Sequence, residues 1–299
     1  MKTSIKLFTA LSKIIFTLFA FTILFNSCSS PKETTAQPAN YESPLKVMTF
    51  NLRYGAADDG EDSWQYRKQM VFDVIRNFNP DILGVQEALD FQITEIIDEL
   101  PGYNYIGVGR DNGKTKGEYS AILYARDRFI VDTSETFWFS ETPQVAGSKS
   151  WGNNITRICT WGKFFDKFSG KEFFALNVHL DHESVPSRIK SASAIIDKIN
   201  SFNTNLPVIL TGDFNTGESE ETIKVIKQNN LLDSYYVVNE KTSSDGTFNS
   251  FKGEDTGDKI DYIFINDKLS VKYSEIIKTN RNGRYPSDHF PVKAAVDFK

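Results

Sequence analysis

The sequence predicts an α/β domain in which helices cover β-sheets, and three observations lead to this prediction. Apolar runs of strand length alternate with segments whose apolar residues recur at helical spacing. The middle of the chain is rich in short aromatic and branched runs divided by Gly, Asp and Lys turns. No low-complexity linker interrupts residues 44–299, so this range is predicted to form one domain.

The first half of the domain is predicted to contain two strand–helix units. The expected strands cover residues 45–50 and 81–86, and the expected helices cover residues 64–78 and 89–100. Asn79-Pro80 ends the first helix and Pro101-Gly102 ends the second, because proline cannot continue a helix. Glu87 follows directly after the second strand.

The second half is predicted to be richer in strands. The expected strands cover residues 103–108, 120–124, 155–165, 172–180, 207–210, 260–265 and 292–296, and the expected helix covers residues 187–200. Several polar side chains follow these strands at their carboxyl ends, where the active sites of layered α/β proteins gather. The order of elements therefore also predicts where a site lies.

The first 27 residues are predicted to be a signal peptide of the lipoprotein type. Three lysines flank the apolar run at residues 14–25. That run is shorter than the roughly 20 residues that cross a membrane, but it is typical of a secretory leader. Ser27-Cys28 resembles the lipobox of bacterial lipoproteins, in which the cysteine is acylated and becomes the mature N-terminus. A plain signal peptide with an incidental cysteine is the alternative.

Residues 28–43 are predicted to be a lipid-anchored polar tether, because Ser, Pro, Thr, Glu, Gln and Asn dominate this segment. Acyl chains on Cys28 would hold the domain at a membrane, since each buried CH₂ contributes about 0.8 kcal/mol. We therefore expect a protein of the bacterial cell envelope, anchored at the outer membrane on its periplasmic or surface side. The other cysteine, Cys159, is predicted to be a small buried apolar residue.

The net charge argues against a strongly basic groove for long nucleic acid. The chain has 34 Lys and Arg against 39 Asp and Glu, a formal charge of −5, and the leader removes three Lys, which leaves −8. Tight or processive DNA binders neutralise many phosphates with basic residues. The balance therefore disfavours that class, but it does not exclude a metal enzyme that cuts phosphodiesters.

Five short stretches place an acid, an amide or a histidine after a strand or in a stiffened loop. They are Thr49–Arg53, Val85–Glu87, Asn177–His182, Leu210–Asn215 and Tyr285–Pro291. All three histidines of the chain, His179, His182 and His289, lie in these stretches. Carboxylate and amide oxygens are the ligands that hard cations such as Mg²⁺ prefer. The pattern therefore indicates a divalent-metal site with histidines beside it.

Seven motifs in a fixed order sharpen this interpretation. They are Thr49-Phe50-Asn51, Gln86-Glu87, Gly117-Glu118, Asn177-Val178-His179, Gly212-Asp213-Phe214-Asn215, Lys259-Ile260-Asp261-Tyr262-Ile263-Phe264 and Ser287-Asp288-His289. Together they resemble the endonuclease/exonuclease/phosphatase family, which includes pancreatic-type deoxyribonuclease, over about residues 45–298. The resemblance implies a four-layer α/β/β/α sandwich with two mixed sheets packed face to face.

The same resemblance implies a metal site and the groups that surround it. Asn51, Glu87 and Asp288 would bind Mg²⁺, with Mn²⁺ and Ca²⁺ as alternatives. Asp213 and Asn215 would orient the phosphate and the attacking water, or bind a second ion. On the residues alone, Asn51 also fits a simple turn or cap former.

Two histidine–carboxylate pairs are implied as well. His289, polarised by Asp261, would be the general base, and His179, supported by Glu118, would donate a hydrogen bond or proton to the phosphoryl oxygens. A carboxylate on one imidazole nitrogen fixes the tautomer and raises basicity at the other. Glu118 also fits a surface charge beside Gly117.

Further side chains are assigned to the substrate. Arg157 is expected to meet phosphate through its planar guanidinium, with a salt bridge to a neighbour as the alternative. His182 is assigned to substrate binding, with a structural role as the alternative. The indoles of Trp138, Trp151 and Trp161 fit either stacking on a base or sugar, or packing in the core or at its rim.

The expected activity is metal-assisted hydrolysis of a phosphomonoester or phosphodiester without a covalent intermediate. The substrate classes that fit are a phosphorylated small molecule, a phospholipid head group and a nucleic acid, cut by a monomeric domain. A secreted or anchored nuclease is the alternative enzyme. Alternatives of another class are a non-catalytic surface lipoprotein on the same fold and a glycan-binding protein that uses exposed tryptophans.

Overall fold

Two six-stranded sheets form the centre of the computed structural model, which describes residues 44–299. The first sheet has the order β11-β12-β1-β2-β4-β3 and the second β5-β6-β7-β8-β10-β9. The strands of the first sheet are β1 (Leu45–Asn51), β2 (Ile82–Ala88), β3 (Tyr103–Ile106), β4 (Tyr119–Ala125), β11 (Leu269–Ile276) and β12 (Val292–Phe298). Those of the second are β5 (Phe129–Trp138), β6 (Ile158–Asp166), β7 (Glu172–His179), β8 (Val208–Asp213), β9 (Leu232–Asp233) and β10 (Asp261–Ile265).

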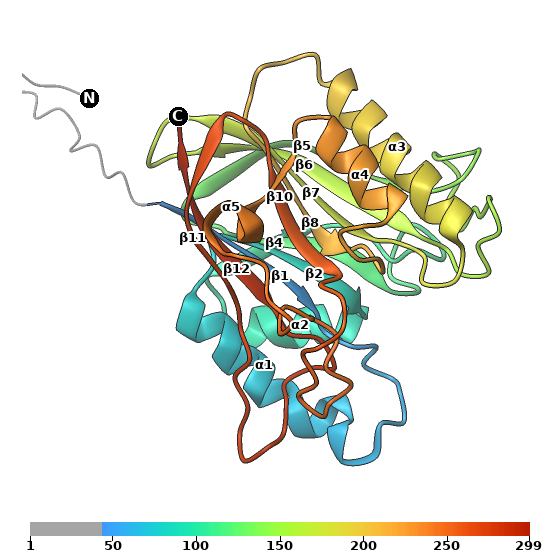
Figure 1. Cartoon of the computed structure of the whole chain (residues 1–299), viewed down its shortest axis with the longest axis vertical. Helices are drawn as coiled ribbons and strands as arrows, with labels where there is room; N and C mark the ends of the chain where they lie inside the picture. The colour runs from blue at the N-terminus through green and yellow to red at the C-terminus, as the bar shows by residue number, and fades with distance from the viewer. Residues whose placement is uncertain (1–43) are drawn as a thin grey trace, which may run out of the picture. The chain divides into compact units, whose positions relative to one another are not determined.

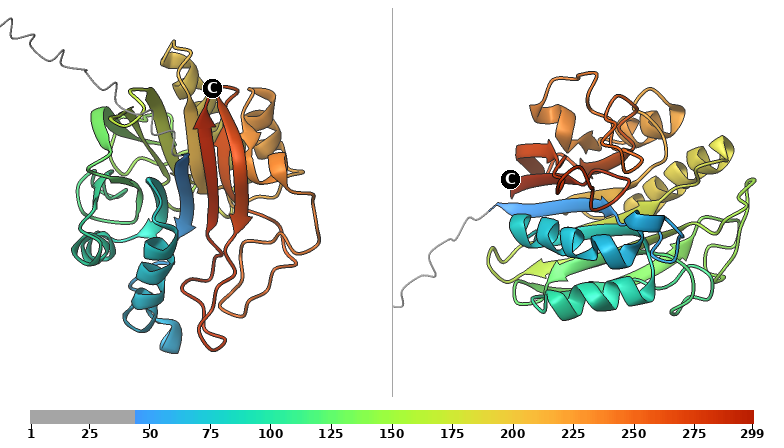
Figure 2. Two further views of the ribbon diagram at one scale, coloured as in Figure 1. Left: turned by 90° about the vertical axis from the view of Figure 1, so that its left-hand side faces the viewer. Right: turned by 90° about the horizontal axis from the view of Figure 1, so that it is seen from below.

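Helices cover the outer face of each sheet (Figures 1 and 2). The helices are α1 (Trp64–Phe78), α2 (Asp90–Glu99), α3 (Val185–Ser201), α4 (Glu221–Gln228) and α5 (Ser234–Val238), with a short 3₁₀ turn, η1, at Gly60–Asp62. Apolar residues of α1 and α2 pack with the outer face of β1, β2 and β4. Those of α3 and α4 pack with β7, β8 and β10.

A third apolar cluster fills the space between the two sheets. It joins residues such as Val47 and Ile122 of the first sheet to Phe164, Phe173 and Ile209 of the second. Each sheet is thus buried on two faces over its central strands, as expected for sheets enclosed by helices. The layer order helix, sheet, sheet, helix confirms the four-layer sandwich with two mixed sheets facing each other.

Each sheet contains one central parallel pair, and these pairs aim their carboxyl ends at the same end of the sandwich. β1 runs parallel to β2, and β7 runs parallel to β8. Because parallel strands finish at the same edge, the residues after all four strands gather there. One hydrogen bond of 2.9 Å from Asn51 of β1 to Asp213 of β8 shows that the two sheets meet at that end.

A buried polar network and one glycine set the separation of the sheets beneath this end. Asn177 Oδ1 accepts hydrogen bonds from Gln86 Nε2 at 2.7 Å and Thr211 Oγ1 at 3.0 Å. Its Nδ2 donates to the carbonyls of Val85 and Ala121. Gly84 lies directly opposite, where a Cβ would come within 2.2 Å of Thr211 Oγ1. Asn177 and Gln86 of the sequence motifs therefore join the sheets and do not face the site.

The predicted signal peptide, the lipidated Cys28 and the tether of residues 28–43 lie outside the described residues. Within residues 44–299, no helix is long and apolar enough to cross a membrane.

Candidate active site

A cavity of about 570 Å³ opens where the strand ends converge. Its walls are formed by side chains from nearly every motif of the sequence. The lining residues are Arg53, Tyr54, Glu87, Arg110, Glu118, Ile155, Arg157, His179, His182, Asp213, Asn215, Phe248, Gly257, Asp258, Ile260, Asp288 and His289. Its volume falls in the range of about 300–1,000 Å³ that is usual for small-molecule sites.

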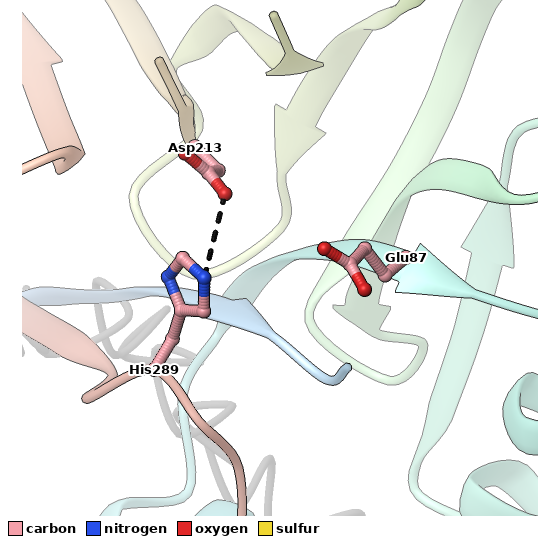
Figure 3. A group of neighbouring side chains, drawn as sticks. All are labelled: Glu87, Asp213 and His289. Atoms are coloured by element: carbon pink, nitrogen blue, oxygen red, sulfur yellow. Dashed lines mark ion pairs between the residues drawn. The ribbon is translucent and has the colours of Figure 1, made fainter. Parts of the chain in front are cut away.

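Glu87, Asp213 and His289 form a group of side chains in the cavity that could hold a metal ion (Figure 3). One ligand atom of each lies within 4.8 Å of the others. Asn51 Nδ2 joins the two acids, because it donates to Glu87 Oε1 at 3.0 Å and to Asp213 Oδ2 at 2.9 Å. Burial, and next the charge of Asp261, raise the pKa of Asp213 to about 7.

The local backbone conformation directs Glu87 into the cavity. Glu87 has φ 56° and lies where the pairing of β2 with β4 becomes irregular. Gln86 points into the space between the sheets, where it contacts Asn177. At the irregularity the next side chain, Glu87, is directed into the cavity and not onto the outer face of the sheet. Asn215 and Arg53 also have positive φ, 51° and 60°. Three non-glycine residues in this sparsely populated region at one site indicate backbone strain held for function.

His289 is paired with Asp261 at the base of the cavity. His289 Nδ1 lies 2.9 Å from Asp261 Oδ2, and its Nε2 lies 3.8 Å from Asp213 Oδ2. Burial alone would lower the pKa of His289, but the carboxylates of Asp261 and Asp213 raise it well above its ordinary value. The pair implied by the family resemblance is thus in contact, with Nε2 left towards the cavity.

Asp288 lies beside this group, next to an arginine. Asp288 Oδ2 is 3.7 Å from Arg53 Nη1, and Ser287 Oγ donates to the Asn51 carbonyl at 2.7 Å. Burial raises the pKa of Asp288, and the negative charge of Glu87 raises it further. The structure therefore brings Glu87 and Asp288 to one cavity, and Asn51 is buried within hydrogen-bond distance of Glu87 without lining the cavity.

His179 lies close to Asp213 but makes no hydrogen bond to Glu118. His179 Nε2 is 3.6 Å from Asp213 Oδ2, whereas Nδ1 is 4.0 Å from Glu118 and has no hydrogen-bond partner. Glu118 instead accepts two hydrogen bonds of 2.7 Å from Arg110, so it is a half-buried member of the site and not a free surface charge. Burial, and next the charge of Arg157, hold the pKa of His179 well below its ordinary value.

Arg157 and His182 lie on the cationic wall of the cavity. Arg157 is buried; its Nη2 lies 2.8 Å from His182 Nδ1, and its Nε lies 3.5 Å from Asp181. Burial, and next the charge of Arg110, lower the pKa of Arg157. The position of Arg157 is compatible with both predicted roles. It contacts the acid Asp181, as a salt bridge requires, and it also lines the cavity, as contact with phosphate requires.

None of Trp138, Trp151 and Trp161 lines the cavity. Trp138 and Trp161 are buried in or near the core, and Trp151 binds Glu141 through its indole nitrogen. Of the two alternatives for these tryptophans, packing in the core or at its rim therefore agrees with the structure, and stacking on a substrate in this cavity does not.

The sequence did not single out Arg110 and Phe248. Arg110 belongs to the hairpin loop before β4 and pairs with Glu118. The short distance of eight residues along the chain is the one feature of the sequence that could have indicated this pair. Phe248 is 46% exposed in the cavity, with its ring centroid 5.2 Å from that of His289. None of the sequence motifs contains Phe248. An isolated antiparallel β-bridge between Phe248 and His289 places it at the site.

The donor set suits a hard divalent cation. Two buried carboxylates and a third acid converge, and burial raises the pKa of Asp213 and Asp288, as expected for acids whose charge needs a cation. Asn51 presents its amide nitrogen to the acids and its oxygen to the Arg53 amide. Its predicted role as an oxygen ligand therefore requires the amide plane to turn over, so that the oxygen faces the acids' side.

Residues 48–289 match the model of the Endonuclease/Exonuclease/phosphatase family. Among curated proteins, the chain is 30% identical over 271 residues to uncharacterized protein L388 of Acanthamoeba polyphaga mimivirus. That similarity covers 83% of this chain and 98% of the viral protein.

Two solved structures from Bacteroides thetaiotaomicron are also similar. An endonuclease/exonuclease/phosphatase family protein has 37% identity and a TM-score of 0.82, and covers 86% of this chain and 96% of its own. A mannosyl-6-phosphatase of strain VPI-5482 has 38% identity and a TM-score of 0.80, and covers 85% and 100%.

Proposed function

This chain belongs to the endonuclease/exonuclease/phosphatase family of hydrolases, and on this premise we propose that it is a divalent-metal-dependent phosphatase of phosphorylated sugars. The observation that carries the proposal is the composition of the cavity where the strand ends converge. Glu87, Asp213 and Asp288 supply negative charge, and Arg157, His179 and His182 supply donors to the same cavity. An enclosed site with both features fits a terminal phosphate held between a cation and an arginine.

The acid side of the cavity would hold the metal. Glu87, Asn51 and Asp288 would be its ligands, and Asp213 is hydrogen-bonded to the same amide as Glu87. A bound divalent cation would polarise the phosphoryl oxygens and stabilise the leaving oxygen. Mg²⁺ fits these oxygen donors best, with Mn²⁺ and Ca²⁺ as alternatives.

His289 would act as the general base. Asp261 holds a proton on Nδ1, so Nε2 is the nitrogen that exchanges a proton, and it lies on the side of Asp213. The charges of Asp261 and Asp213 raise the pKa of His289, and a cation held by the neighbouring acids would oppose this effect and leave Nε2 unprotonated for its role as base. Asp213, with Asn215 next to it, orients a water, and His289 Nε2 accepts its proton as the oxygen attacks phosphorus. No side-chain nucleophile is needed, so hydrolysis proceeds in one displacement.

The cationic wall would hold the phosphate. Arg157 and His182 already contact each other, and together they present donors to the non-bridging oxygens. His179 stays uncharged because its pKa is depressed, so it donates a hydrogen bond through one nitrogen without adding a charge. Arg110 holds Glu118 away from His179 Nδ1 by its two hydrogen bonds.

An apolar wall supports a sugar as the group that carries the phosphate. Phe248 and Tyr54 are both exposed, and Ile155 lies on the same cavity. The cavity has room for more than a phosphate, and aromatic rings bind the C–H faces of rings by stacking. The similarity to a mannosyl-6-phosphatase supports this substrate class.

We also propose that the enzyme acts in the bacterial cell envelope. The support is the sequence pattern of residues 1–28, a secretory leader followed by Ser27-Cys28. Labelling of cells with a radioactive or clickable fatty acid, comparing the natural chain with Cys28→Ala, tests the anchor. Loss of label in the variant is expected, and equal labelling of both would contradict it.

A phosphoester panel with and without chelator tests the enzymatic proposal. It contains mannose 6-phosphate, glucose 6-phosphate, p-nitrophenyl phosphate, bis(p-nitrophenyl) phosphate, phospholipid vesicles, DNA and RNA. We expect Mg²⁺-dependent release of phosphate from the sugar monoesters. Faster cleavage of DNA or RNA would favour the nuclease alternative, and saccharide binding without any turnover would favour the non-catalytic lipoprotein.

A further inference from the structure

Arg67 carries its charge in the protein interior without a carboxylate in direct contact among residues 44–299, although the charges of Asp288 and Asp59 act on it through space. The side chain lies on α1 and is 0% exposed. Among the described residues it forms no ion pair, and all of its hydrogen bonds go to backbone carbonyls. Burial lowers the pKa of Arg67 to about 10, so it remains charged at neutral pH. A buried charge of this kind is normally paired, so its carbonyl partners need an explanation.

Those carbonyls come from three different segments around the cavity. Arg67 Nη1 donates to the carbonyls of Leu52 at 2.7 Å and Pro286 at 2.9 Å. Its Nε donates to the backbone carbonyl of Asp62 at 2.8 Å, and its Nη2 donates to the backbone carbonyl of Arg53 at 3.2 Å. Leu52 and Arg53 follow β1, whereas Pro286 precedes the Ser287-Asp288-His289 motif more than 200 residues later. One nitrogen thus ties together two segments that lie just beyond the β1–β12 pairing, which ends at Thr49 and Val292.

Two aromatic rings fix the plane of the guanidinium. The centre of the group lies 5.3 Å from the ring of Trp64 and 5.6 Å from that of Phe251. Stacking of this kind restrains arginine but cannot be reproduced by the point charge of lysine. A second tie between the same two segments is Ser287 Oγ, which donates to the Asn51 carbonyl at 2.7 Å.

We infer that Arg67 is a positioning residue that fixes residues 51–53 against residues 286–289. The first segment carries Asn51, and the second carries Asp288 and His289. A displacement of about 1 Å at a reacting group can cost roughly 100-fold in rate, so a clamp on both segments affects turnover without touching substrate. The inference rests on the proposed hydrolase function for its kinetic consequence.

Arg67→Lys tests the clamp, because lysine keeps the charge but cannot span the four carbonyls. The matched control is Arg128→Lys, a buried arginine bound to Asp81 and Asp166, neither of which lines the cavity. Hydrogen–deuterium exchange of peptides covering 51–55 and 285–290 is measured together with kcat and KM for the most active panel substrate. The thermal midpoint of each variant is recorded alongside.

For Arg67→Lys we expect exchange in both peptides to rise at least about tenfold, and kcat to fall by about 10- to 100-fold with KM within about threefold. For Arg128→Lys we expect loss of thermal stability, with exchange rising near 126–130 and kcat within about twofold of the natural chain. Unchanged exchange at 51–55 and 285–290, or an equal loss of kcat in both variants, would overturn the inference.

Ser287→Ala keeps the test decisive if Arg67→Lys does not fold. It removes the second tie with little change of volume, and it should raise exchange in the same two peptides by a smaller factor; unchanged exchange there would count against the clamp. If the natural chain hydrolyses nothing in the panel, the proposed function fails. The exchange pattern still decides whether Arg67 holds the two segments.

Discussion

Asp261 Oδ2 lies 2.9 Å from His289 Nδ1, and this contact leaves His289 Nε2 as the free nitrogen of the ring. Asp261 opens β10, and His289 precedes β12, so the pair joins the two sheets at the base of the cavity. A histidine held in this way accepts a proton in a defined direction.

His289→Ala and Asp261→Asn are therefore expected to lower kcat by about 10²- to 10⁴-fold, because the first removes the base and the second leaves its tautomer unfixed. Initial rates on the best panel substrate measure the effect. Asp267→Asn, an exposed acid on the turn before β11, is the control. Retention of full activity by His289→Ala would rule out its role as general base.

Removal of the metal is expected to abolish hydrolysis, and Mg²⁺ should restore it. Glu87→Gln keeps the size of the side chain but removes its charge from the ligand group. Loss of an outer partner of a metal site typically costs about 10- to 100-fold in affinity, so loss of this ligand should cost at least that much. Calorimetric titration with Mn²⁺ measures the affinity directly. Equal Mn²⁺ binding by the natural chain and the variant would place the metal elsewhere.

Phe248→Ala is expected to weaken the binding of sugar phosphates without slowing the chemical step. Aromatic stacking contributes about 1–3 kcal/mol in related contacts, which corresponds to roughly a 5- to 150-fold rise in KM. Phe91→Ala, which truncates an exposed phenylalanine on α2, is the matched control. A change in KM for p-nitrophenyl phosphate equal to that for mannose 6-phosphate would argue against a sugar contact.

Asp166→Asn is expected to destabilise the fold in a pH-dependent way. Burial alone would raise the pKa of Asp166, but hydrogen bonds from Arg128 and the Phe168 amide lower it below 3.8. The unfolded chain therefore binds this proton more readily, and the stabilisation is present above pH 3.8 and is lost as pH falls through the folded pKa.

At neutral pH, breaking such a buried pair costs about 3–5 kcal/mol. Urea unfolding of the natural chain and the variant between pH 3 and 7 measures the difference. The gap in unfolding free energy should be largest at pH 7 and shrink towards pH 3. A gap that widens as pH falls would contradict the assigned ionised state of Asp166.

Gly84→Ala is expected to destabilise the packing between the sheets. The added Cβ would lie 2.2 Å from Thr211 Oγ1 and 2.5 Å from Asn177 Oδ1, both held in the buried network. Overpacking of a core typically costs about 1–3 kcal/mol. Gly102→Ala adds the same methyl group where no atom lies within 4 Å, so it should leave the urea midpoint nearly unchanged.

The sequence predicted the central strands and the long helices because their apolar patterns are strong. It missed β5 (Phe129–Trp138), whose middle residues are mostly exposed or half-buried at the edge of the second sheet. It also missed β11, another edge strand with few buried residues, and the short α4. Edge strands need fewer apolar residues, so periodicity alone identifies them poorly.

The motif residues of the site could be found in the sequence, but their partners could not. Glu118 was assigned to His179, yet the structure pairs it with Arg110 through the geometry of one hairpin loop. Arg67 lies on a helix whose apolar spacing was read correctly, and nothing in that pattern distinguishes a buried arginine from an exposed one. Such contacts depend on segments far apart in the chain, which spacing does not encode.

The direction of β1 separates the start of the described domain from the cavity. The strand begins at Leu45 and ends at Asn51, whose amide donates to Glu87 at the cavity. Six steps of about 3.3 Å separate these points by roughly 20 Å. The chain therefore enters the domain at the end of the first sheet that is remote from the catalytic groups.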